Sequence, residues 1–263
     1  MALAADLRIC LCQPRSAAGS ADHALGTLVQ GLAVARAAGA DVAVFPELLF
    51  PGYNAPDVAA LAQPLDGPWM AAARDAVREA GLVCAFGLAE REGARVFNSA
   101  AAVSADGSIA AIYRKIQLYG AREARIFTPG DAYATFDLKG RKAGLLVCYD
   151  VEFAPHVAAL AAAGADIILV PTANMVPFTH VSRLTVPSQA VNHGVAIVYA
   201  NYAGAEGDLT YCGESLVANA DGTVVARAGA GEAMLVADLP APDPALMSTQ
   251  AHDLRMPGRG LPA

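Results

Sequence analysis

Three side chains that could work together in catalysis stand at the ends of apolar stretches of this sequence. Glu47 comes directly after the run Val-Ala-Val-Phe-Pro, Lys115 closes the alternating run that begins at Ala110, and Cys148 ends the run Gly-Leu-Leu-Val-Cys. A carboxylate can take the proton of a thiol, the thiolate can attack a carbonyl carbon, and a cation can stabilise the negative charge that develops. The combination predicts acyl-transfer chemistry.

Each of the three residues also has an ordinary structural explanation. A glutamate after a strand is commonly a solvated loop residue, a basic strand end commonly lies on the surface, and a cysteine in an apolar strand is usually a small core residue. However, an apolar run from Leu48 to Tyr53 follows Glu47 at once, so we expect the Glu47 carboxylate to be buried and paired. Strand alternation turns Arg114 and Lys115 to opposite faces, so one of these two cations should point inward.

The residues after Cys148 favour a functional thiol. Asp150 and Glu152 follow it closely, and the segment 155–163 is expected to be helical. A thiol at a strand-to-helix turn lies near backbone N–H groups and a helix N-terminus, both of which favour a thiolate and an oxyanion. None of the five histidines is comparably placed, so the sequence disfavours a Cys–His pair.

Two stretches that echo each other indicate which elements position these residues. Residues 38–46 read Ala-Gly-Ala-Asp-Val-Ala-Val-Phe-Pro, and residues 163–171 read Ala-Gly-Ala-Asp-Ile-Ile-Leu-Val-Pro, with Asp41 and Asp166 separated by 125 positions. Each stretch follows an alanine-rich helical segment, turns at a glycine and enters an apolar strand that stops at a proline. Further on, an Asp-Gly pair lies between β-like runs in 103–108 and again in 217–223, which predicts two hairpins.

The repeated order of helix, strand and hairpin predicts one domain made of two similar halves. Each half offers a sheet with helices on one face, and its other face is best buried against the sheet of the other half. We therefore expect an α/β fold, a four-layer αββα sandwich with pseudo-duplicated halves, over residues 1–239. The proline-rich residues 240–263 are expected to form a C-terminal tail, on the surface or against a neighbouring subunit. Chance similarity between alanine-rich segments is the alternative to a duplication.

Composition narrows the class of protein. Of the 263 residues, 55% are hydrophobic and 16% are charged, which excludes a disordered chain, yet no apolar run reaches the ~18 residues of a membrane span. The net charge of −7 offers no footprint for nucleic acid. The five cysteines are odd in number and form no CxxC motif, so neither a disulfide framework nor a zinc site is expected. With no signal peptide expected in residues 1–10, we predict a cytoplasmic protein that binds a small molecule.

Three motifs resemble those of the nitrilase superfamily of carbon–nitrogen hydrolases. Phe-Pro-Glu-Leu at 45–48 with Pro-Gly-Tyr at 51–53 resembles its glutamate motif, Tyr-Arg-Lys-Ile-Gln-Leu-Tyr-Gly at 113–120 its lysine motif, and Leu-Leu-Val-Cys-Tyr-Asp at 145–150 its cysteine motif. Glu123 matches a second glutamate that many members carry near the lysine. The resemblance implies an αββα sandwich that commonly dimerises, and hence a homodimer or a larger homo-oligomer.

The likeness is greatest to aliphatic amidases of the aminopentanamidase kind, and residues 170–175 and 199–206 also carry it. It implies hydrolysis of a small amide through a cysteine thioester, with no metal and no organic cofactor. Glu47 would act as base and then as acid, Cys148 as nucleophile, and Lys115 with the N–H of Tyr149 would hold the oxyanion. Glu123 would bond Lys115 or position the substrate. The expected pocket wall consists of Tyr53, Tyr119, Tyr149, Asn174 and Met175.

The sequence also departs from the family pattern and leaves alternatives open. Relatives often read Phe-Pro-Glu where this chain has Phe-Ala-Pro at 153–155, and often have an arginine at the position of Ala158, near the dimer contact. A nitrile or N-carbamoyl hydrolase with the same residues is one alternative, and a catalytically silent binding or scaffold protein is another. Glu152 and Glu206 could favour a substrate that carries an amine.

Overall fold

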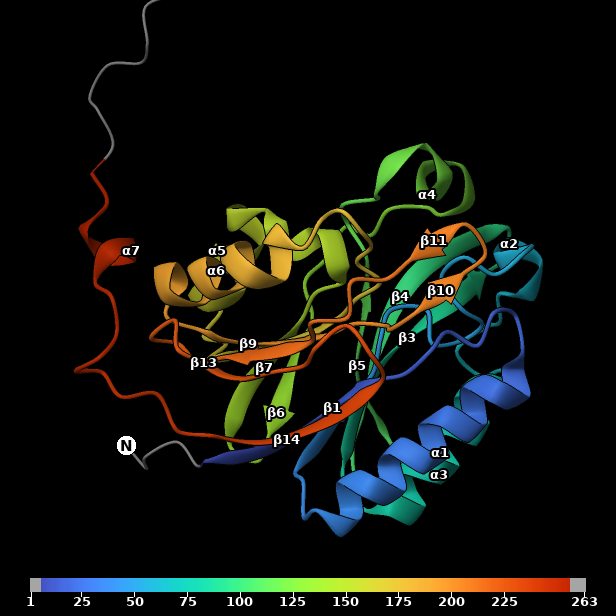
Figure 1. The fold of residues 1–263 in the computed structure, drawn as a ribbon, viewed down its shortest axis with the longest axis horizontal. Helices are drawn as coiled ribbons and strands as arrows, with labels where there is room; N and C mark the ends of the chain where they lie inside the picture. The colour runs from blue at the N-terminus through green and yellow to red at the C-terminus, as the bar shows by residue number, and fades with distance from the viewer. Residues whose placement is uncertain (1–5, 256–263) are drawn as a thin grey trace, which may run out of the picture.

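Two six-stranded mixed sheets form the centre of the protein, whose structure, a computed structural model, describes residues 6–255. The two sheets pack face to face, and helices cover their outer faces (Figure 1). The first sheet has the order β14 (Ala233–Leu239), β1 (Leu7–Gln13), β2 (Val42–Val44), β3 (Val83–Glu92), β4 (Arg95–Val103) and β5 (Ile109–Arg114). The second has the order β13 (Val224–Arg227), β12 (Leu216–Ala218), β9 (Ala196–Ala200), β8 (Ile167–Pro171), β7 (Arg141–Leu145) and β6 (Thr135–Leu138).

The two sheets repeat one topology, which confirms the predicted four-layer sandwich with pseudo-duplicated halves. Strands β1, β2 and β3 are parallel, and β3, β4 and β5 form an antiparallel meander. In the same way β7, β8 and β9 are parallel, and β9, β12 and β13 form a meander. The two Asp-Gly pairs lie in the β4–β5 and β12–β13 turns, as their hairpin signals predicted.

Four helices form the outer layers, and their ends follow local sequence signals. Helix α1 (Ala21–Ala37) begins after Ser20, whose side chain accepts a hydrogen bond from the N–H of His23 (3.2 Å). Helix α3 (Pro68–Ala80) has a proline in its first turn and ends at Gly81, which is left-handed. These two helices cover the first sheet, and α5 (Ala154–Ala162) and α6 (Val186–His193) cover the second.

Burial explains why the central strands are continuously apolar. Every residue of β2, β8 and β9 is buried, because each strand has a sheet on one face and helices on the other. The remaining elements are short: α2 (Val58–Leu61), α4 (Gly120–Ile126), α7 (Gln250–Asp253), the strands β10 (Ala205–Glu206) and β11 (Leu209–Thr210), a 3-10 turn (Cys148–Glu152) and a π turn (Val181–Thr185).

The segment predicted to be a tail follows the last strand. β14 ends at Leu239, and α7 in the following segment contacts α6. Residues 256–263 of the predicted tail lie outside the described residues. Between residues 6 and 255, no helix is both long enough and apolar enough to cross a lipid bilayer.

Candidate active site

Cys148 lies at a sharp turn between β7 and α5. The strand ends at Leu145, three residues earlier than the apolar run predicted, and Cys148 is the first residue of the 3-10 turn. Its φ of +47° lies in the left-handed region, which a residue with a side chain rarely adopts. Such strain at a candidate nucleophile is typical of turns that hold a side chain toward a site.

Asp150 connects this turn to the strand end that carries Lys115. One carboxylate oxygen of Asp150 accepts hydrogen bonds from the N–H of Val147 (3.1 Å) and the hydroxyl of Tyr113 (2.9 Å). The other accepts from the N–H of Gln117 (2.7 Å). Since Tyr113 and Gln117 lie on either side of Lys115 in the chain, one buried carboxylate fixes the lysine segment against the cysteine turn.

Lys115 is the cation that points inward, and it lies between two glutamates. Its Nζ donates to Oε1 of Glu47 (2.8 Å) and to Oε1 of Glu123 (2.9 Å), and all three side chains are fully buried. Arg114 points the other way and pairs with Glu90 and Glu92, with 27% of its side chain exposed. Strand alternation therefore gives the two neighbouring cations different partners, with Arg114 partly exposed and Lys115 fully buried.

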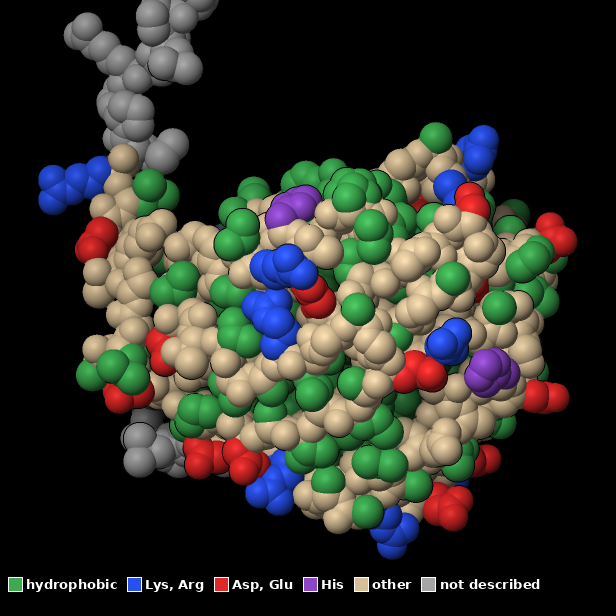
Figure 2. Space-filling model, viewed as in Figure 1, with side chains coloured by type: hydrophobic (Ala, Val, Ile, Leu, Met, Phe, Trp, Pro, Cys, Tyr) green, Lys and Arg blue, Asp and Glu red, His purple; other side chains and the backbone are tan. Residues whose placement is uncertain are grey.

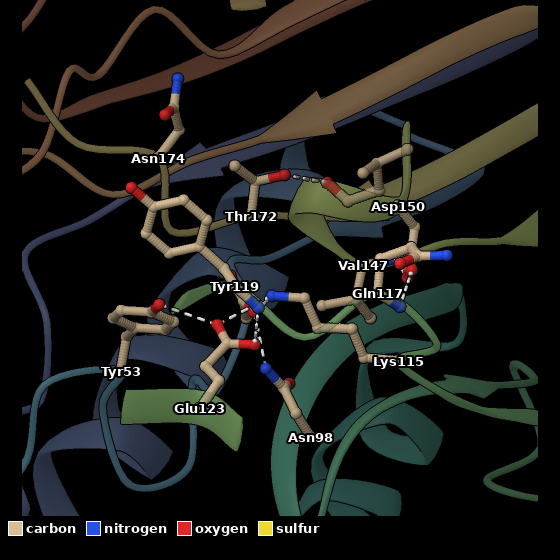
Figure 3. A network of polar contacts seen from close by, with 12 residues as sticks. Tyr53, Asn98, Lys115, Gln117, Tyr119, Glu123, Val147, Asp150, Thr172 and Asn174 are labelled. Atoms are coloured by element: carbon tan, nitrogen blue, oxygen red, sulfur yellow. Dashed lines mark hydrogen bonds and ion pairs between the residues drawn. The ribbon is translucent and has the colours of Figure 1, made fainter. Parts of the chain in front are cut away.

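Each glutamate has further partners that fix its carboxylate. Oε1 of Glu47 also accepts from the Asn98 amide (2.6 Å), whereas its Oε2 is buried and has no hydrogen-bond partner among residues 6–255. Glu123 accepts from the hydroxyl of Tyr53 (2.8 Å) and the N–H of Tyr119 (2.9 Å). In Figure 3 the side chains of Tyr53, Asn98 and Lys115 approach this region from different elements.

Burial and charge set the protonation of the network. Burial raises the pKa of the Cys148 thiol well above its usual value, against the opposing effects of the Lys115 charge and a backbone hydrogen bond from Ala173. Burial also raises the pKa of Glu47. Burial alone would lower the pKa of Lys115, but the charges of Glu47 and Glu123 together raise it, so the ammonium form persists. The turn at Cys148 was expected to favour the thiolate, and burial overrides that local effect. A base must therefore remove the thiol proton.

Cys148 opens into a cavity of about 220 Å³. This is below the range of about 300–1,000 Å³ typical of drug-sized ligands, so the cavity suits a small molecule. The walls are largely aromatic, and the Tyr119 ring packs edge-on against both Tyr149 and Phe178. A hollow of about 420 Å³ between α1 and α3 is larger but contains none of the residues above. The lining of the smaller cavity is Tyr53, Tyr119, Cys148, Tyr149, Glu152, Ala173, Asn174, Met175, Phe178 and His180.

The structure places most of the site residues that the sequence analysis singled out in or behind this cavity, and Glu206 outside its lining. Lys115 joins Glu47 and Glu123 directly, the charges of these three groups act on Cys148, and the five expected wall residues all line the cavity. Sequence reasoning missed Asn98, although an Asn-Ser pair between the apolar residues Val96–Phe97 and Ala100–Val103 of β4 was a usable signal. Glu206 is 4% exposed and does not line the cavity, whereas Glu152 does.

Comparison with known proteins identifies the family. Residues 8–245 match the family model for carbon–nitrogen hydrolases. The chain belongs to the carbon–nitrogen hydrolase family. This membership makes it a hydrolase that acts on carbon–nitrogen bonds, as the resemblance to the nitrilase superfamily predicted.

Similar proteins within this family include amidases and a nitrilase. An (R)-stereoselective amidase from Pseudomonas sp. is 35% identical, over 79% of this chain and 76% of that protein. A nitrilase from Pyrococcus abyssi is 34% identical over 74% of each chain. Among solved structures, a mutant amidase from Nesterenkonia sp. AN1 with acrylamide added at its active-site cysteine has a TM-score of 0.87 at 32% identity, covering 95% of this chain and 96% of that one. Another mutant of that amidase, in complex with butyramide, has a TM-score of 0.88 at 32% identity and covers 97% of each chain.

Proposed function

We propose that this carbon–nitrogen hydrolase converts a small amide into a carboxylate and ammonia through a thioester on Cys148. The observation that carries the proposal is the buried network behind the thiol, in which Oε2 of Glu47 has no partner among the described residues and is free to accept a proton. The small aromatic cavity supports a short, largely apolar acyl group. The similar amidase that forms cysteine adducts supports the choice of nucleophile.

The first half of the reaction forms the thioester. Glu47 takes the thiol proton, and Sγ of Cys148 attacks the amide carbon, so that an S–C bond forms and the carbonyl electrons move to oxygen. The Lys115 ammonium and the N–H of Tyr149 stabilise this oxyanion. The oxyanion then collapses, the C–N bond breaks, and Glu47 gives its proton to the departing nitrogen as ammonia leaves.

The second half hydrolyses the thioester with the same residues. Glu47 removes a proton from water, and the resulting hydroxide attacks the thioester carbon. The C–S bond breaks, the thiolate recovers a proton from Glu47, and the carboxylic acid gives its proton to solvent and leaves as a carboxylate. Lys115 stays protonated throughout, because the neighbouring charges of Glu47 and Glu123 raise its pKa. Glu123 holds Lys115 and positions the amide.

Ammonia release from a panel of short amides, nitriles and N-carbamoyl compounds tests this function. Turnover of amides is the expected result, and it should disappear in Cys148→Ala but persist in Cys212→Ala, since Cys212 is buried outside the cavity. Release only from nitriles or carbamoyl compounds would replace the amidase proposal with one of those activities. No turnover and no trapping of the thiol would favour a silent scaffold.

A second candidate narrows the substrate to amides that carry an ammonium group, and Glu152 favours it. Its carboxylate lines the cavity and forms no salt bridge with the described residues. Burial raises the pKa of Glu152, while the charges of His180 and Lys115 oppose this rise. The aromatic faces of Tyr119, Tyr149 and Phe178 add a surface that attracts cations.

Matched amides with and without a terminal ammonium group test the role of Glu152. Glu152→Gln keeps the shape but removes the charge, so KM for the ammonium-bearing amide should rise about tenfold, as expected for the loss of a charge-assisted contact. KM for the uncharged amide of equal length should stay the same. Equal changes for both amides would exclude charge recognition by Glu152.

The proposal includes a homodimer that acts in the cytoplasm. The free state of all five cysteines fits a reducing compartment. Leu184 and Val176 are 69% and 55% exposed, and Figure 2 shows apolar side chains gathered along the upper edge of the molecule, beside α5 and α6. Sedimentation should detect a dimer that Leu184→Glu dissociates. The control Val34→Glu on α1 should leave it intact, and a monomeric wild-type protein would contradict the dimer.

A further inference from the structure

Glu206 lies outside the cavity and connects segments that form its wall. It lies on the β10–β11 hairpin and is buried. Its Oε2 accepts a hydrogen bond from the backbone N–H of Asn54 (2.9 Å) and another from the hydroxyl of Tyr211. The Asn54 side chain returns two bonds to the hairpin, to the carbonyl of Glu206 (2.9 Å) and to the carboxylate of Asp208 (2.8 Å). The hairpin and the loop that carries Tyr53 are thereby clamped together.

The same hairpin is fastened to the opposite wall of the cavity. The N–H of Val176 donates to the carbonyl of Thr210 (2.9 Å), and the N–H of Cys212 donates to the carbonyl of Asn174 (3.0 Å). A β-bridge also pairs Met175 with Tyr211. Asn174 and Met175 line the cavity, as Tyr53 does, so the hairpin connects two segments of the cavity wall.

Tyr53 connects this clamp to the reacting groups. Its hydroxyl donates to Oε1 of Glu123, the same oxygen that accepts from Lys115. The backbone bond from Asn54 to Glu206 is one residue away from Tyr53. A shift of this loop would move the Tyr53 hydroxyl, weaken its hydrogen bond to Glu123 and change the contact between Glu123 and Lys115.

The loop packs closely against Glu206 at Gly52. A Cβ added to Gly52 would lie 2.6 Å from Oε1 of Glu206 and 2.9 Å from the backbone nitrogen of Ala18, so only glycine fits here. Oε1 of Glu206 is itself buried and has no partner among residues 6–255. Burying a carboxylate with an unsatisfied oxygen costs free energy. This cost indicates that Glu206 contributes more than packing to this region.

We propose that Glu206 is a positioning residue for amide hydrolysis: it holds Tyr53 through the backbone of Asn54, and Tyr53 in turn holds Glu123 beside Lys115. This inference rests on the proposed amidase function. It gives different roles to Glu152 and Glu206, to which the sequence analysis had assigned the same possible role. Glu152 lines the cavity, whereas Glu206 holds the cavity wall in place.

A double-mutant cycle tests this positioning role. Glu206→Ala should lower kcat for an amide about 10- to 100-fold with a smaller change in KM, because a misplaced catalytic group loses rate. Tyr53→Phe should lower kcat as well. If Glu206 acts through Tyr53, then adding Glu206→Ala to Tyr53→Phe should lower kcat little further. Multiplicative losses of kcat would overturn the proposal.

Two further variants separate positioning from general stability. Glu214 is similarly buried but bonds Ser182 and Arg183, so the effect of Glu214→Ala should multiply with that of Tyr53→Phe. Glu206→Gln keeps an oxygen that can accept the Asn54 N–H and should restore most of the kcat lost in Glu206→Ala. If Glu206→Ala does not fold, the cycle is run with Glu206→Gln, whose smaller loss should again vanish in the Tyr53→Phe background.

Hydrogen exchange provides a measurement that does not depend on turnover. The N–H of Asn54 should exchange faster in Glu206→Ala than in the wild type, while amides of β2 should keep their protection. This outcome would support the clamp even if the wild-type protein released no ammonia from amides, in which case only the proposed function would fail. Unchanged exchange at Asn54 would overturn the clamp itself.

Discussion

The two halves of the chain share a topology but carry different residues at equivalent strand ends. The position 125 residues after Glu47, at the end of β8, is Thr172, and the two ends meet: the N–H of Glu47 donates to the carbonyl of Thr172 (3.3 Å). In the proposed mechanism the first half supplies the base and the cation, after β2 and β5. The second half supplies the nucleophile, after β7.

This difference shows how a duplicated scaffold divides its chemistry. The strands of both halves are buried and serve packing, whereas the residues just after them are free to diverge. In the proposed mechanism the acid–base groups therefore come from the first half and the thiol from the second. The predictions that follow test whether this division of roles holds.

The largest effect is expected at the nucleophile. Cys148→Ala should abolish turnover and keep the fold, because the side chain is small and partly exposed at a turn. A reactive acyl donor should modify the wild-type protein at Cys148, as located by mass spectrometry of peptides. Modification at Cys84 or Cys212 instead would move the nucleophile to another element.

Substitutions of Glu47 and Glu123 should affect acylation and amide hydrolysis differently. Oε2 of Glu47 has no hydrogen-bond partner between residues 6 and 255 and is the proposed acceptor of the thiol proton, whereas both Glu123 oxygens accept hydrogen bonds. We expect Glu47→Gln to lose both amide hydrolysis and acylation by an activated ester. Glu123→Gln should lose amide hydrolysis but keep measurable acylation, since such an ester depends less on positioning.

Burst-phase acylation followed by intact-mass measurement on both mutants separates these roles. Rapid acylation of Glu47→Gln with none for Glu123→Gln would reverse the two assignments. The first half would still provide the base, but from α4 rather than from the end of β2.

The sequence was sufficient for the fold because its signals are local. A glycine after a helix, a proline after a strand and an Asp-Gly turn each act within a few residues. Asn98 was missed because its partner Glu47 is 51 residues away, so the polar pair in β4 marks an unusual position but does not reveal what it bonds. The raised thiol pKa was missed for a similar reason, since it follows from burial by distant elements rather than from the turn around Cys148.

A close backbone contact in the first half provides a further test of the difference between the two halves. Gly87 in β3 lies beside the end of β2, and a Cβ there would be 2.2 Å from the nitrogen of Leu48 and 2.6 Å from Cα of Glu47. The equivalent residue in β9 is Ala200, which bonds the N–H of Thr172 through its carbonyl (2.8 Å). The strand end that carries Glu47 therefore requires a closer approach than its counterpart.

Gly87→Ala should displace Glu47 and lower kcat/KM about 100-fold, with an overpacking cost of about 1–3 kcal/mol in stability. The matched variant Ala200→Gly should keep activity and lose only about 0.5–1 kcal/mol. Kinetics and thermal unfolding of both proteins measure the difference. Equal losses of activity would mean that the two strand ends are not functionally distinct.

The pH dependence should report the buried base. Glu47 must be ionised to take the thiol proton, and burial raises its pKa, so activity should be lost as pH falls through a value above that of an exposed glutamate. Measurement of kcat/KM against pH locates this acidic limb. A limb in the ordinary range of an exposed glutamate would point to a different base.

The smallest effect is expected at Thr172, the counterpart of Glu47. Its hydroxyl donates to the carbonyl of Val170 (3.2 Å), and its contact with Glu47 uses only its own backbone carbonyl. Thr172→Val removes the hydroxyl, keeps the side-chain volume and leaves that backbone contact available. The change should cost about 1 kcal/mol in stability, as for one lost hydrogen bond, and should reduce kcat/KM only a few-fold. Thr172→Ser, which keeps the hydroxyl, is the control for the lost bond. A loss of activity in Thr172→Val as deep as that in Glu47→Gln would show that the second half contributes more than the nucleophile, and the division of roles between the halves would then have to be abandoned.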